Sequence, residues 1–177
     1  MIIKRIYHKI TDKHFSQKLY FTILHILRGD IILSAWIYPD EDCHYPNNNW
    51  GDDVNIPLIR ALTGKKCVLR HATLFDNVEN LLCIGSIIEG FTDPYSIIWG
   101  SGAMHGRDVM QCSPKTVLAV RGPLTRKDLL SKGIDCPEIY GDPALLLPFF
   151  YRPKVKKQYK LGVVPHYADY DLVLCNI

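Results

Sequence analysis

Short apolar runs recur along the chain, separated by polar segments rich in glycine and proline. One such run, residues 117–120, is long enough for a buried strand and too short for a helix. Pro123 suits the first position of a following helix, and Gly133 fits the left-handed residue that closes it. Residues 134–140 return to an apolar pattern and predict a second strand. A strand, a short helix and another strand predict parallel pairing with a right-handed crossover.

The same alternation of short strands with helices or loops is predicted over most of the chain. A helix is expected from Asp52 or Asp53, either of which suits its N-cap, to Thr63, with Gly64 just beyond it. Further strands are predicted at residues 31–38, 66–70, 80–84, 96–99 and 160–165. This alternation predicts an α/β domain over residues 30–177, built on an open, mostly parallel Rossmann-like sheet with flanking helices.

Residues 1–29 form a separate basic amphipathic segment, in which isoleucines and leucines recur at roughly helical spacing among lysines. Its apolar run at residues 19–27 is far short of the ~20 residues that a membrane-spanning helix needs. The pattern favours a helix packed on the domain with a solvated cationic face. Peripheral contact with a membrane surface is the alternative.

Composition limits the classes of function. A formal net charge of +3 is too small to argue for nucleic acid as a partner. The six cysteines are scattered and form no CxxC pair, so they predict neither a metal site nor a disulfide framework. Cys67, Cys83 and Cys175 lie in apolar runs and are expected to be buried thiols in a reducing cytoplasm.

Glycines follow four of the predicted strands, at Gly85, Gly100, Gly122 and Gly141. Ligands of parallel α/β sheets bind at the carboxyl ends of the strands, and glycine lets backbone approach a ligand closely. Each glycine alone is explained as well by a tight turn, but four in the same position favour a ligand edge. The dinucleotide fingerprint is absent, because His105 stands where its third glycine would be.

Five segments in order resemble the polysaccharide pyruvyl transferase family. They are Asn49-Trp50-Gly51-Asp52-Asp53, Trp99-Gly100-Ser101-Gly102, Val120-Arg121-Gly122-Pro123-Leu124-Thr125, Gly141-Asp142-Pro143-Ala144 and Gly162-Val163-Val164-Pro165-His166-Tyr167. The resemblance implies a two-domain GT-B type fold, of which this chain resembles the N-terminal half. It also implies transfer of pyruvate from phosphoenolpyruvate to a sugar as a ketal, in bacterial exopolysaccharide or cell-surface polysaccharide biosynthesis.

Further expectations follow from that resemblance. The family's catalytic histidine lies in a Ser-Ser-x-His-Gly segment that this sequence does not contain, so the second domain is expected to be missing and this piece alone inactive. The donor is phosphoenolpyruvate, with no other cofactor, and the acceptor is a sugar or lipid-linked oligosaccharide at the inner face of the membrane. Two alternatives stay open: half of a GT-B type glycosyltransferase that uses a nucleotide sugar, and a non-catalytic, truncated sugar-binding remnant.

Candidate site residues come from the matched segments. Arg121, between a strand exit and a helix start, is the expected anion ligand, with an ion pair to Asp142 as the alternative. Asp52 and Asp53 are expected to orient sugar hydroxyls, with a helix-capping role as the competing explanation for one of them. His105 is a candidate contact to the acceptor, although a surface-loop histidine explains it as well. The predicted substrate-binding set is Asn49, Gly51, Asp52, Asp53, Gly100, Ser101, Gly102, His105, Arg121 and Asp142.

Overall fold

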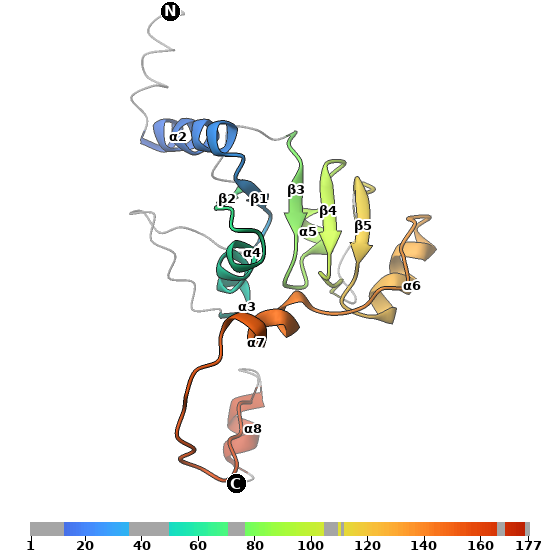
Figure 1. The fold of residues 1–177 in the computed structure, drawn as a ribbon. Coiled ribbons are helices and arrows are strands. Elements are labelled where there is room, and N and C mark those ends of the chain that lie inside the picture. The colour runs from blue at the N-terminus through green and yellow to red at the C-terminus, as the bar shows by residue number, and fades with distance from the viewer. Residues whose placement is uncertain are drawn as a thin grey trace, which may run out of the picture.

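The computed structural model describes residues 13–35, 50–70, 77–104, 110, 112–165 and 169–175. Five parallel strands form one sheet in the spatial order β2-β1-β3-β4-β5, with helices packed around it (Figure 1). The strands are β1 (Ile31–Leu33), β2 (Cys67–Leu69), β3 (Asn80–Leu82), β4 (Ser96–Trp99) and β5 (Thr116–Ala119). This arrangement confirms the predicted α/β, Rossmann-like class.

Helices and turns connect the strands and follow the last of them. They are α2 (Lys13–Arg28), α3 (Trp50–Asp53), α4 (Asn55–Thr63), α5 (Ile88–Phe91), α6 (Pro123–Ser131), the 3₁₀ turn η2 (Pro143–Leu146), α7 (Leu147–Phe150) and α8 (Tyr170–Leu174). In Figure 1, α2 lies beyond the amino ends of the strands, whereas α3, α6 and α7 lie near their carboxyl ends. The two ends of the sheet therefore carry different structures.

The strand order sets the position of the ligand edge. β1 pairs with β2 on one side and with β3 on the other, so the chain crosses back over β1 after leaving β2. The carboxyl ends of β1 and β3 therefore flank a topological switch point. In open α/β sheets this is the place where loops diverge and leave a crevice for a ligand.

The core consists of two apolar clusters, one on each face of the sheet, because neighbouring residues of a strand point to opposite faces. Leu33 and Leu69 pack with Leu58 and Ile59 of α4 on one face. On the other face the cluster joins strands, α5 and α6 through Leu82, Ile88, Ile98, Val117 and Leu129. Burying each such side chain fully contributes about 1.5–3 kcal/mol. These clusters hold the strands, and with them their carboxyl ends, in fixed register.

Three helices end at a glycine in the left-handed conformation, whereas one predicted N-cap is wrong. Gly29, Gly64 and Gly133 have φ values of 64°, 69° and 75°, as expected for residues that close helices. The predicted capping role of Asp52 or Asp53 is wrong. Both aspartates lie in the separate turn α3, and α4 begins after Val54 without a side-chain cap.

Several strand predictions were too long or wrong. β2 and β3 end one and two residues before the predicted positions 70 and 84. β1 ends at Leu33 rather than at residue 38, and residues 36–38 lie outside the described residues. Within 134–140 only Tyr140 pairs, through a single parallel bridge to Val120, because Pro137 interrupts that stretch and lacks the N–H that a strand needs. Residues 160–165 form no strand: Val164 is 95% exposed, so this apolar run has no described partner.

One of the three cysteine predictions is wrong. Cys83 is buried and Cys67 is half-buried, but Cys175 is exposed just after α8. Over the ranges that the structure describes, no helix combines the length and the apolarity needed to cross a bilayer.

Candidate functional site at the carboxyl edge of the sheet

The side chain of Asn55 ties the first helical segment to the end of β3. Its Nδ2 donates to the carbonyl oxygens of Asp52 (3.0 Å) and Ile84 (3.2 Å), and its Oδ1 accepts from the Ile84 N–H (2.8 Å). Asn55 is 1% exposed, so these bonds lie away from water, where an unmade bond is costly. Asn55 thus fixes the turn that carries Asp52 and Asp53 against the switch point.

Sequence reasoning missed Asn55, although a signal was present. An asparagine in the otherwise apolar sequence Asn55-Ile56-Pro57-Leu58-Ile59 is unusual, because a short amide side chain competes with helical backbone bonds unless it has a fixed partner. Its partner, the backbone at Ile84, lies 29 residues away in the sequence and is visible only in the fold.

Asp52 lies beside Gly85 at this switch point. It is only 8% exposed, and its Oδ1 would lie 3.5 Å from a Cβ built on Gly85. Gly85 has φ +122°, a conformation that side-chain-bearing residues rarely adopt. The structure therefore brings a predicted acidic residue and a predicted strand-exit glycine together.

The exits of β3 and β4 are joined by hydrogen bonds. The carbonyl oxygen of Gly85 accepts from the N–H of Gly102 (2.9 Å) and from the hydroxyl of Ser101 (2.9 Å). Ser101 is fully buried, so its hydroxyl holds the two loops together and does not face solvent. The two predicted segments form one continuous rim, in which Gly102 is buried beneath the Arg121 side chain.

Gly100 serves close packing within the chain. A Cβ at this position would stand 2.3 Å from Cδ of Pro143 and 2.8 Å from the carbonyl oxygen of Gly141, and φ is +83°. Only glycine avoids both conflicts. The sequence predicts that a glycine at this strand exit makes room for a ligand. In the structure Gly100 makes room for the 141–143 loop instead.

Arg121 is exposed and lies against the rim. Its backbone N–H donates to the carbonyl oxygen of Ser101 (3.1 Å), and its guanidinium lies on Gly102, where a Cβ would meet Cζ at 2.5 Å. Among the described residues its side chain has no ion pair or hydrogen bond. No ion pair joins Arg121 to Asp142 in the described residues, where the Asp142 carboxylate accepts from the N–H of Ala144 (2.9 Å).

Helix α6 starts immediately after Arg121. Gly122 is its N-cap without a side-chain cap bond, and Pro123 occupies its first turn. The first N–H groups of a helix carry partial positive charge and point outward, and they attract anions. A guanidinium with free donors beside such a helix start is suited to a carboxylate or a phosphate.

Two carboxylates near this edge have a buried oxygen without a hydrogen-bond partner among the described residues: Oδ1 of Asp53 and Oε2 of Glu89. The other oxygen of Glu89 accepts from the N–H of Met104 (2.8 Å), two residues beyond Gly102. Sequence reasoning did not single out Glu89, although an acid after the apolar residues 87–88 is an indication. Both side chains can accept hydrogen bonds from hydroxyl groups.

Thiol chemistry at this edge is disfavoured. Burial, and next the nearby Asp142 carboxylate, raise the pKa of Cys83 to about 12. Because the thiolate is the nucleophile and metal ligand, a thiol that stays protonated at neutral pH is chemically inert. Among the described residues no group of three His, Cys, Asp or Glu side chains is arranged to hold a metal ion.

Not all predicted site residues can be placed. Gly51 lies in α3 and is half-buried, whereas Asn49 and His105 fall outside the described residues. The remaining predicted residues occupy one edge of the sheet, either in the rim itself or, like Asp142, in the loop that packs on Gly100.

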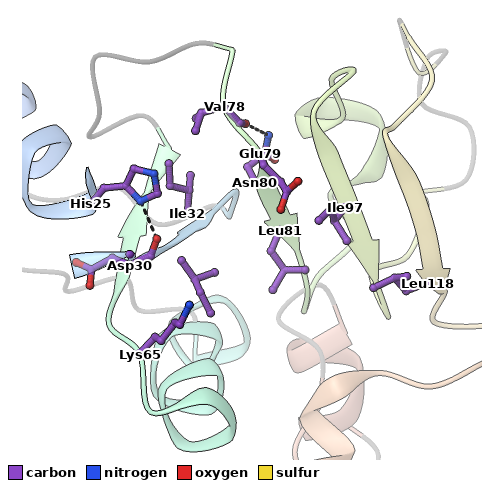
Figure 2. Close-up of a pocket in the computed structure, with 12 residues that line it drawn as sticks. His25, Asp30, Ile32, Lys65, Val78, Glu79, Asn80, Leu81, Ile97 and Leu118 are labelled. Carbon is purple, nitrogen blue, oxygen red and sulfur yellow. Dashed lines mark hydrogen bonds between the residues drawn. The ribbon is translucent and has the colours of Figure 1, made fainter. Parts of the chain in front are cut away.

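A cavity of about 400 Å³ lies at the opposite edge of the sheet (Figure 2). Lys65, Glu79 and Asp30 line it near the amino ends of the strands, together with Ile97 and Leu118 from the sheet. It shares no residue with the predicted site. Its location at the amino ends is not where open α/β sheets bind their ligands.

Comparisons with protein-family models, with curated proteins and with solved structures find no match for this chain. The arguments for its function therefore rest on the site geometry and on the sequence segments that form it.

Proposed function

We propose that this domain belongs to a pyruvyl transferase, which moves pyruvate from phosphoenolpyruvate onto a sugar as a ketal. In this reaction a proton adds to the methylene carbon of phosphoenolpyruvate, and C2 becomes cationic. One sugar hydroxyl adds to C2, a second displaces phosphate, and each hydroxyl loses its proton. The reaction requires cations for the donor's carboxylate and phosphate, and acceptors that orient the sugar hydroxyls.

The observation that carries the proposal is Arg121, an exposed guanidinium at the start of α6 whose side chain has no partner among the described residues. Phosphoenolpyruvate offers two anionic groups, and a planar guanidinium binds either of them in a two-bond geometry. We assign Arg121 and the first turn of α6 to the donor's anionic end.

On the acceptor side we assign Asp52, Asp53 and Glu89 to hydroxyl recognition. Oδ1 of Asp53 and Oε2 of Glu89 are buried acceptors that lack a donor in the described residues. A sugar hydroxyl that displaces the atoms now covering them would supply one. The acceptor is then a sugar or a lipid-linked oligosaccharide, handled at the cytoplasmic face of a membrane. In the GT-B type arrangement that we propose, this rim forms one wall of a cleft between two domains.

Phosphate release from phosphoenolpyruvate tests the reaction. The protein expressed from the complete reading frame is incubated with phosphoenolpyruvate. The acceptor, a bacterial polysaccharide or lipid-linked oligosaccharide fraction, is either added or left out. We expect phosphate release that depends on the acceptor, together with a pyruvate ketal on the product. Phosphate release that is indifferent to the acceptor excludes ketal transfer. In a parallel incubation with a nucleotide sugar in place of phosphoenolpyruvate, acceptor-dependent release of the nucleotide identifies a glycosyltransferase instead.

A further inference from the structure

The most apolar side of α2 faces away from the domain. Its exposed apolar residues follow the spacing i, i+1, i+4, i+7 and i+8, which places them on one helix face. They are Leu19, Tyr20, Ile23, Ile26 and Leu27, called here the α2 stripe. Ile26 is 63% exposed and Leu27 is 76% exposed. A helix that served only the core would bury this face.

Contacts at the C-terminal end of α2 tie this end of the helix to the residues that lead into β1. Thr22 is 4% exposed, and the His25 ring Nδ1 donates to the carbonyl oxygen of Asp30 (2.7 Å), just before β1 (Figure 2). After α2, Gly29 closes the helix with its N–H bonded to the His25 carbonyl (2.9 Å). The α2 stripe lies away from the side of the helix that carries the buried Thr22.

Charge is concentrated in the same part of the chain. Residues 1–29 contain six lysines and arginines and a single acidic residue, a formal charge of +5, although the whole chain carries only +3. The remaining residues, 30–177, are therefore net negative, at −2. An outward apolar stripe within a cationic segment is the combination found in helices that lie on anionic bilayers.

We propose that the α2 stripe docks on the surface of a bilayer that contains anionic phospholipid. The apolar side chains enter the boundary between headgroups and acyl chains, and the net positive charge of residues 1–29 is attracted to the negative surface. Burying the stripe in a second copy of this chain would instead bring two segments of +5 together, which opposes association. The charge thus favours the lipid surface over self-association.

This proposal is independent of the transfer reaction. Figure 1 places α2 beyond the amino ends of the strands, and the rim around Arg121 lies at their carboxyl ends. β4 alone separates the two ends by four residues, about 13 Å of strand. Changes in the stripe therefore leave the candidate site untouched, and vesicle binding needs no donor or acceptor sugar.

Vesicle flotation of the full chain tests the proposal. We expect binding to phosphatidylcholine vesicles with about one-third phosphatidylglycerol, and weak binding to pure phosphatidylcholine. Raising salt from about 0.1 to about 0.5 M should reduce binding several-fold, because the attraction is screened. The double variant Ile26→Ser/Leu27→Ser should lower the partition coefficient about tenfold.

A matched control removes apolar side chains of similar exposure elsewhere. Leu145 and Phe149, near the carboxyl ends of the strands, are 71% and 72% exposed, and Leu145→Ser/Phe149→Ser should bind vesicles as the parent does. Circular dichroism checks that both double variants keep the parent's helix content. Equal binding by the stripe variant and the parent overturns the proposal. So does light scattering that shows a dimer for the parent and a monomer for the stripe variant.

Discussion

The guanidinium of Arg121 lies directly on Gly102. A Cβ at position 102 would come within 2.5 Å of Cζ and 2.6 Å of Nε and one terminal nitrogen. The atoms in conflict are the far end of a flexible side chain, so the chain can fold around an added methyl group if the guanidinium moves. Gly102 therefore determines where the Arg121 charge sits, and the fold does not depend on it.

Gly102→Ala should consequently weaken binding of the donor while changing the stability of the domain only slightly. We expect the free energy of unfolding to change by no more than about 1 kcal/mol, since φ at this position is not in the left-handed region and the clash is relieved at a side-chain tip. Binding of phosphoenolpyruvate should weaken about fivefold, as the displaced guanidinium loses part of a charge-assisted contact. Titration calorimetry and urea unfolding measure the two quantities. Unchanged binding would show that the position of Arg121 is irrelevant to the donor.

Asn55→Ala should destabilise the domain strongly. It leaves the N–H and the carbonyl of Ile84 without their partner in a buried setting, which costs about 2–4 kcal/mol in the free energy of unfolding. Asn77→Ala, at an exposed asparagine, is the matched control and should change that free energy by less than about 0.5 kcal/mol. Similar urea midpoints for the two variants would remove Asn55 from its clamping role.

Gly100→Ala and Gly133→Ala compare two glycines with similar backbone angles, φ +83° and +75°. At Gly133 nothing lies within 4 Å of an added Cβ, so the cost is the left-handed conformation alone, about 1 kcal/mol. At Gly100 the Cβ also meets the Pro143 ring at 2.3 Å, and we expect about 2 kcal/mol more. Thermal unfolding of both variants gives the difference. Equal losses would mean that the 141–143 loop does not pack against β4's exit.

Stability should fall at alkaline pH through Cys83. Burial raises the pKa of this thiol to about 12 in the folded chain, whereas the unfolded thiol ionises near its ordinary value of about 8.5. The contribution of the protonated Cys83 thiol to the free energy of unfolding is complete below the lower of these pKa values. It is lost as pH rises between them, by up to about 1.4 kcal/mol per pH unit.

Cys83→Ala should therefore make the unfolding free energy decline less steeply above about pH 8.5. This holds even if the substitution lowers the unfolding free energy at neutral pH. Cys67, whose pKa burial raises to about 11, retains a part of the slope. The exposed Cys175 offers the control, because Cys175→Ala should leave the slope as it is. Urea unfolding at several pH values under reducing conditions measures it, and identical slopes for the parent and Cys83→Ala would contradict the expected ionisation.

Short sequence patterns predicted many of the helices and strands, whereas the geometry of the candidate site depends on contacts between residues that are distant in the sequence. The strand of residues 96–99, the start of α6 at Pro123 and the end of α4 at Gly64 follow from short patterns, and the structure has them as predicted. Residues 160–165 show the limit of that approach, because an apolar run becomes a strand only if a neighbour pairs with it. The partner of Asn55 and the contact between Gly102 and Arg121 depend on residues 29 and 19 positions away. Spacing along the chain carries no information on them.

The outward face of α2 is a different case. Helical spacing in residues 1–29 predicted the helix, but the preferred interpretation placed its apolar side on the domain. Thr22 and His25 lie on the attached side instead, and the apolar residues remain outside. Periodicity identifies an apolar face without stating what covers it.

Binding of phosphoenolpyruvate to the parent chain, Arg121→Ala and Lys127→Ala tests the central claim most directly. Lys127 is an exposed cation on α6, so its variant controls for the loss of one positive charge. We expect the parent and Lys127→Ala to bind with equal affinity by calorimetry and phosphorus NMR. For Arg121→Ala we expect at least about tenfold weaker binding, the loss of one charge-assisted contact. Undiminished binding by Arg121→Ala, or no binding by the parent, would contradict the assignment of this rim to the donor.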